Sequence, residues 1–106
     1  MPNIIDYRAH VGSNPDRQFK ATLFQSERLM LGLNCLEPGQ SQPAHIHDAA
    51  AKFYYVVEGR ARFTVGDAQV EAAAGDVVVC PAGERHGIEE ALERTTLLVG
   101  IAPWKG

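Results

Sequence analysis

The chain has 106 residues, of which 45% are hydrophobic, and a formal net charge of −3 at pH 7. This length supports one modest core, so we expect a single domain over residues 1–106. The charges are scattered without a basic run, which argues against nucleic acid as a partner. The N-terminal residues contain neither the apolar segment of a signal peptide nor a span long enough for a membrane helix. We therefore expect a cytoplasmic protein with no membrane partner.

After an N-terminal arm over about residues 1–20, short β-type runs alternate with turn residues. Apolar and β-branched residues dominate four segments, each followed by glycine or proline: 28–36, 52–58, 60–65 and 77–80. Turns that recur every 8 to 12 residues or so are typical of an all-β sandwich or barrel. The one helix-like window, 88–94, is short and lies between a glycine and a β-branched run. We expect a loop or a single turn there.

The alternation of side chains along a strand predicts which faces are buried. Segment 60–65 alternates strictly between apolar and polar residues, as a strand with one solvated face should. Segment 52–58 is apolar on both faces, and so is much of 28–36, so something must cover the outer faces. We expect a symmetric homodimer. The alternative is that the N-terminal segment folds back over the sheet.

Two histidines one residue apart, His45 and His47, precede the segment 52–58. On a strand they would project from the same face about 6 to 7 Å apart, a separation from which two imidazoles can converge on one ion. A third histidine, His86, follows a turn after the segment 77–80. Taken alone, a His-x-His pattern is weak evidence for a metal, because most histidines lie on the surface or are hydrogen-bonded in a core.

The spacing around these histidines resembles the two sequence motifs of the cupin superfamily. Over residues 39–59 the chain has Gly-x5-His-x-His-x4-Lys-x6-Gly, with Lys52 where the family usually has glutamate. Over residues 75–90 it has Gly-x5-Pro-x-Gly-x2-His, with Glu90 where the family often has asparagine. The resemblance covers about half of the chain, and every glycine, the proline and all three histidines are in register.

The resemblance implies an all-β fold, a small antiparallel β-barrel of the jelly-roll type. It also implies that a divalent transition metal, such as Zn, Fe, Ni or Mn, is held in the mouth of the barrel by His45, His47 and His86. Three imidazoles without the carboxylate still form an open face for such a metal, which leaves positions for water or a ligand.

Lys52 is the serious departure from the family pattern. An ammonium has three donors and no lone pair, so in its ordinary state it cannot bind a cation. At about 5 Å from a divalent ion it would be repelled by about 6 to 7 kcal/mol at an effective dielectric constant near 20. Lys52 must swing out of the mouth, lose its proton, or face an anion placed between it and the metal; otherwise no metal binds. The small residues 48–51 can turn the chain and bring Lys52 to the face of the histidines.

Exchanging the family's glutamate for lysine makes the site about two charges more positive, which favours a small anionic ligand such as a carboxylate or enolate. One class of function is a metal-dependent dioxygenase, isomerase or decarboxylase, in which Lys52 orients or protonates a small organic acid. The other is a non-catalytic binding or sensor domain, in which the pocket is a relic or holds no metal. By alternation alone, the candidate substrate-binding residues are Tyr54 and Phe63, with Val56 and Ala61 beside them.

Overall fold

All four segments predicted to be strands are strands in the computed structural model, which describes residues 3–104. The elements in chain order are η1 (Tyr7–Ala9), β1 (Phe19–Gln25), β2 (Met30–Leu36), β3 (Gln42–Ile46), β4 (Ala51–Glu58), β5 (Arg60–Val65), β6 (Ala68–Ala73), β7 (Val77–Cys80), β8 (Arg85–Ala91) and β9 (Thr95–Ala102). Within the described part of the chain, no helix has the length and apolarity needed to cross a membrane. The ends of the expected domain, residues 1–2 and 105–106, lie outside the described residues.

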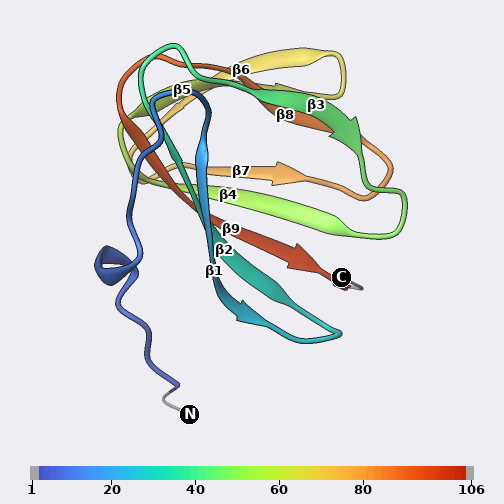
Figure 1. Cartoon of the computed structure of the whole chain (residues 1–106). Helices are drawn as coiled ribbons and strands as arrows, with labels where there is room; N and C mark the ends of the chain where they lie inside the picture. The colour runs from blue at the N-terminus through green and yellow to red at the C-terminus, as the bar shows by residue number, and fades with distance from the viewer. Residues whose placement is uncertain (1–2, 105–106) are drawn as a thin grey trace.

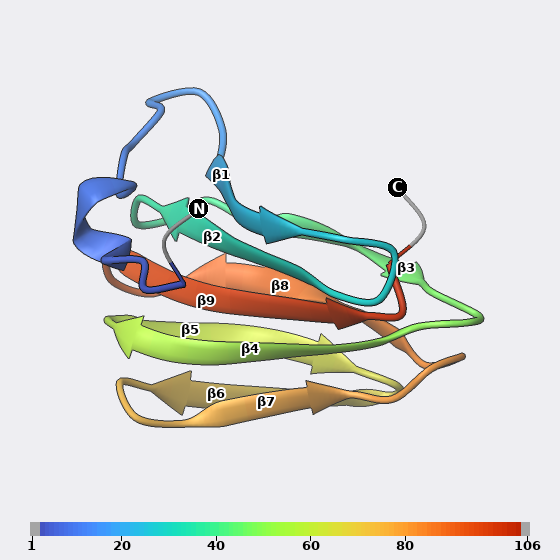
Figure 2. The same cartoon turned by 90° about the horizontal axis from the view of Figure 1, so that it is seen from below.

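The strands form two antiparallel sheets that pack face to face (Figures 1 and 2). The first sheet has the order β1-β2-β9-β4-β7, and the second has the order β3-β8-β5-β6. Because the chain passes repeatedly from one sheet to the other, the architecture is of the jelly-roll type. The predicted all-β jelly-roll fold is confirmed. Its barrel consists of two separate sheets and not of one closed ring of hydrogen-bonded strands among residues 3–104.

The core lies between the two sheets and follows the alternation of the strands. In β5, Ala61 and Phe63 are fully buried and face inward, while Arg62 stays partly exposed. In β4, Tyr54 and Val56 are fully buried, and the ring centroids of Tyr54 and Phe63 are 5.1 Å apart. Inward-facing residues of both sheets therefore supply one continuous apolar layer.

The pairing of β3 with β8 positions the histidines. β3 is an edge strand of the second sheet, and its residue His45 lies directly opposite His86 of β8. A register shift between Gln42 and His45 marks an irregularity in this pairing. Next to His86, a Cβ atom on Gly87 would lie 2.7 Å from the Cα of Ala44. Glycine at this position therefore permits the close approach of the two strands.

The prediction of a loop or a single turn over 88–94 is wrong for the first half of this window. Residues 88–91 are the last residues of β8, where Glu90 pairs with Arg62 and Ala91 with Ala61 of β5. Pairing with a neighbouring strand overrides the helix-like composition of this short segment. Only the residues that follow Ala91 form the bend that leads into β9.

Candidate metal centre

The three histidines come together from two neighbouring strands. His45 belongs to β3, His47 directly follows that strand, and His86 belongs to β8. One ring nitrogen of each lies within 4.8 Å of the others, and the Nε2 atoms of His45 and His47 are 2.7 Å apart. The structure therefore brings together the three residues that the sequence motifs select as ligands.

Backbone carbonyl groups orient two of the three imidazoles. The Nδ1 atom of His45 lies 3.2 Å from the carbonyl oxygen of Pro43, and the Nδ1 atom of His86 lies 3.1 Å from that of Glu84. An Nδ1–H that donates to a carbonyl leaves the Nε2 lone pair free for a metal. The Nε2 atom of His86 is buried and has no hydrogen-bond partner among residues 3–104. Such a buried nitrogen is satisfied if it binds a cation.

The protonation state of the cluster also fits a metal. Burial lowers the pKa of His47, and the nearby His45 and the charge of Lys52 lower it further. Burial likewise lowers the pKa of His86, against the backbone hydrogen bond to Glu84, which raises it. Both imidazoles are therefore neutral at pH 7, and the neutral form is the one that binds a metal.

The spacing of the cluster needs only a small adjustment around an ion. At a metal–nitrogen distance of about 2.1 Å, two ligand nitrogens of a tetrahedral site lie about 3.4 Å apart. The 2.7 Å between the Nε2 atoms of His45 and His47 and the limit of 4.8 Å for the whole cluster lie on either side of this value, so side-chain rotations that change each separation by no more than about 1.4 Å would suffice. The three residues thus fit a divalent transition metal and leave further coordination positions open.

Lys52 points into the molecule beside this cluster. The chain bends at Asp48 and Ala49, β4 then begins, and the side chain of Lys52 is buried with 7% of its surface exposed. Its Nζ atom donates a hydrogen bond of 3.3 Å to Oε1 of Gln42 and lies 4.5 Å from the centroid of the Tyr54 ring. The bend expected from the small residues 48–51 is therefore present, and Lys52 does not swing out to solvent.

The ammonium of Lys52 lacks a counter-charge. None of the ion pairs among residues 3–104 includes this side chain. Burial lowers the pKa of Lys52 to about 8, and the charge of Lys20 on β1 contributes to the lowering. A buried amine without a carboxylate partner is costly for the fold, which makes it a candidate for ligand binding.

A cavity of about 210 Å³ joins Lys52 to His45 and His47. Its polar lining comes from four strands and the residue after β3: Lys20, Thr22, Asn34, Gln42, His45, His47 and Lys52. No carboxylate lies among these residues, while two of them are lysines. The cavity is therefore electropositive even before a metal is added.

Gln42 and Asn34 are polar residues of this cavity that reasoning from the sequence did not select. Gln42 accepts a hydrogen bond from Lys52 through Oε1, and its Nε2 atom donates to Oδ1 of Asn34 over 2.9 Å. The irregular pairing of β3 breaks the alternation, so no sequence signal marked Gln42 as facing inward. Gln42 thus holds the amine of Lys52 in place.

The two predicted substrate-binding residues lie deeper than the cavity. Tyr54 is fully buried, and its hydroxyl donates to Oε1 of Gln42. Phe63 is also fully buried and packs against the ring of Tyr54. Neither side chain lines the cavity of the histidines. Their predicted contact with a substrate stays a prediction, and the contacts observed are those of core residues that support Gln42 and Lys52.

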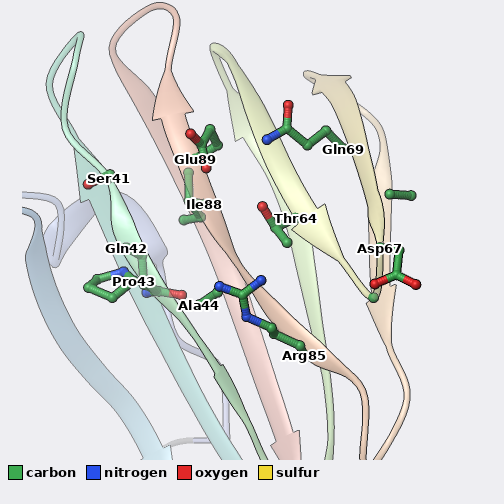
Figure 3. Close-up of a pocket in the computed structure, with 12 residues that line it drawn as sticks. Ser41, Gln42, Pro43, Ala44, Thr64, Asp67, Gln69, Arg85, Ile88 and Glu89 are labelled. Atoms are coloured by element: carbon green, nitrogen blue, oxygen red, sulfur yellow. The ribbon is translucent and has the colours of Figure 1, made fainter.

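A larger hollow, of about 450 Å³, lies on the outer face of the second sheet (Figure 3). Arg85, Glu89, Thr64 and Gln69 surround it, and neither the three histidines nor Lys52 contributes to it. It has charges of both signs and lacks any of the three histidines in its lining, so it is a less suitable chemical site than the smaller cavity, despite its size.

Comparison with known proteins agrees with this geometry. A family model described as Cupin domain matches residues 32–99. An uncharacterised protein of Streptomyces coelicolor is 40% identical over 83 residues, which cover 76% of this chain and 76% of that protein. An oxalate-binding protein of Thermotoga maritima is 33% identical over 81 residues, which cover 76% of this chain and 61% of that protein, so the chain spans about three fifths of its length.

The fold matches a solved structure over almost its whole length. The crystal structure of a protein from Thermus thermophilus is similar with a TM-score of 0.90 and 37% sequence identity, over 96% of this chain and 98% of that chain. The family model covers more than half of the chain, and it includes all three histidines and Lys52. The chain belongs to the cupin family.

Proposed function

We propose that this protein holds a divalent transition metal through His45, His47 and His86 and binds a small organic anion between that metal and Lys52. One observation carries the proposal. The buried amine of Lys52 shares a cavity with His45 and His47 and has no carboxylate partner among residues 3–104. An anionic ligand would supply the missing counter-charge to the ammonium of Lys52 and to the metal ion.

The donors around Lys52 suit a carboxylate. An ammonium has three N–H donors, and Gln42 accepts from one of them at 3.3 Å. The remaining donors are available to the oxygens of a ligand, while Gln42 fixes the direction of the amine. A metal bound by the histidines would supply a second positive charge that polarises an oxygen of the same ligand.

One relative supports a small carboxylate as the ligand class. The Thermotoga maritima protein that is 33% identical to this chain is an oxalate-binding protein. Oxalate is a small anion, as the electropositive cavity requires. We therefore propose a carboxylic acid, in preference to a phosphate or a neutral molecule, as the ligand.

Two functions remain for such a complex. In an enzyme of the dioxygenase, isomerase or decarboxylase type, Lys52 would orient or protonate the bound acid, since no carboxylate in the lining of the cavity could serve as an acid or base. In a non-catalytic binding or sensor domain the same contacts would only hold the acid. The homodimer and the cytoplasmic location expected from the sequence also stay predictions.

Elemental analysis of protein purified without an affinity tag tests the metal. We expect about one divalent transition metal per chain, and we expect that His45→Ala, His47→Ala and His86→Ala each remove it, because two remaining ligands are too few for a stable site. His10→Ala is the matched control, since His10 is exposed and lies outside the cluster. Full metal content in any of the three cluster variants would contradict the ligand assignment.

Calorimetric titration of the metal-loaded protein with oxalate tests the anion. We expect Lys52→Met to weaken binding by about tenfold or more, because a charge-assisted contact is lost. Arg17→Met, which removes an exposed charge outside the cavity, should leave the affinity unchanged. The concentration of the bound acid is then followed by NMR over hours. An enzyme depletes the acid, whereas a binding domain does not.

A further inference from the structure

The cavity of the histidines has an apolar neighbour. This second cavity has a volume of about 340 Å³ and lies between the bend before β4 and the end of β9. Its walls include Ala49 and Ala50 on one side, and Ile101, Pro103 and Trp104 on the other. It is larger than the polar cavity of about 210 Å³ that holds Lys52.

The two cavities meet at a shared wall. His47, Ile101 and Trp104 line both of them. His47 is also one of the three clustered histidines, so a ligand whose oxygens lie beside the cluster is already at the entrance to the apolar cavity. A polar compartment with a few fixed donors next to an apolar compartment is the usual composition of a site for an amphiphilic small molecule.

From this arrangement, and on the basis of the proposed function, we infer that the ligand is a monocarboxylic acid with an apolar chain or ring, and not a bare dicarboxylate such as oxalate. The carboxylate lies between the histidines and Lys52. The apolar part lies against Ala49, Ala50 and Trp104. A dianion of the size of oxalate leaves these apolar walls uncovered and gains nothing from them.

Asp48 narrows the ligand class further. This exposed carboxylate contributes to the apolar cavity and is its only charged lining residue among residues 3–104, apart from the titratable imidazole of His47. A second carboxylate at the far end of a long diacid would enter an apolar cavity beside a like charge, which is unfavourable. The chain of the ligand should therefore end in an uncharged group.

A chain-length series of acids tests the inference directly. Acetate, butanoate, hexanoate and octanoate are titrated into the metal-loaded protein by calorimetry, with oxalate and the diacid adipate for comparison. The affinity should rise about fourfold per methylene until the cavity is full, which follows from the burial of each CH₂ group. Hexanoate should bind more tightly than adipate, which has the same number of carbons. Trp104, the only tryptophan of the chain, provides a second readout through its fluorescence.

Two variants locate the effect. Ala50→Leu fills the apolar cavity and should abolish the rise with chain length, while the affinity for acetate stays within about twofold of the wild type. Ala73→Leu is the matched control, since Ala73 is buried to a similar degree and lines neither cavity. Ala49→Leu, at an exposed position of the same wall, serves if Ala50→Leu does not fold by circular dichroism.

Each outcome decides the matter. If acetate and oxalate bind but affinity does not rise with chain length, the inference fails and the proposed function stands. If affinity rises equally in the wild type and in the cavity-filling variant, the apolar part binds elsewhere, and the inference again fails. If no acid binds at all, the proposed function and the inference fail together. The proposed function and the inference are both supported if hexanoate displaces oxalate and the gain in affinity with chain length is lost only in the cavity-filling variant.

Discussion

Replacing Lys52 by methionine should make the metal-free protein more stable at neutral pH. Methionine has a similar length and no charge, so it can fill the same space beside Tyr54 without a buried ammonium. The hydrogen bond from Lys52 to Gln42 is lost, but Oε1 of Gln42 still accepts from the hydroxyl of Tyr54. The substitution therefore removes a buried charge and leaves no new unpaired acceptor.

The size of the effect follows from the pKa of Lys52. Burial lowers this pKa from 10.5 to about 8. Since one pKa unit corresponds to about 1.4 kcal/mol, the native state disfavours the ammonium by about 3 kcal/mol. This cost is fully present below pH 8, where the amine is charged in both the native and the unfolded state. Between about pH 8 and 10.5 the unfolded state binds more protons, so the wild type gains stability as the pH rises.

Urea unfolding of protein treated with a chelator, followed by the fluorescence of Trp104, measures this difference. We expect Lys52→Met to be more stable than the wild type by up to about 3 kcal/mol at pH 7, and the gap to close as the pH approaches 10.5. Arg17→Met, at an exposed residue outside the cavity, is the control and should change stability by less than about 0.5 kcal/mol. A Lys52→Met variant that is less stable at pH 7, or whose gap does not depend on pH, would refute the reasoning.

Three further predictions concern the site and the assembly. Lys52→Glu should raise metal affinity by about tenfold or more in competition with a chelator, because a carboxylate replaces a repulsive charge at the family's ligand position. The same variant should bind oxalate more weakly. If neither the metal affinity nor the oxalate affinity changes, Lys52 has no role in the site. Tyr54→Phe should lower the free energy of unfolding by about 1 kcal/mol, since Gln42 loses a buried hydrogen bond; an unchanged midpoint in urea would contradict this. The protein should be a homodimer in light scattering, with an interface that includes Val77 and Val79 on β7, which are 56% and 61% exposed. Val79→Lys should then yield monomers. A monomeric wild type would rule out an interface on β7.

Strand alternation and motif spacing were sufficient to predict much of this molecule. The inward residues of β5 follow from a strict two-residue period, which any half-buried strand must have. The convergence of His45, His47 and His86 follows from the resemblance of the spacing to a family pattern. Such features depend on local geometry or on recurring motifs, and both the alternation of residues and the spacing of a motif can be read from a single sequence.

Features that depend on distant segments were not predictable in the same way. The strand character of residues 88–91 comes from pairing with β5, which no local pattern records. The inward position of Gln42 depends on an irregularity in the pairing of β3, and the apolar cavity forms only where residues 49–50 meet residues 101–104. The direction of Lys52 was open, because it depends on how far the chain turns at the bend before β4.

The placement of two ligands on β3 has a consequence for the edge of the second sheet. An edge strand exposes unpaired backbone groups and can detach or recruit a strand from another molecule. His45 and His47 lie on or directly after this edge strand, and His86 lies on its inner neighbour, β8. Coordination of one metal ion by all three histidines would cross-link β3 and β8 through their side chains. Amide hydrogens of residues 42–46 should then exchange more slowly with solvent when metal is bound, and chelation would leave this border of the sheet open to intermolecular pairing.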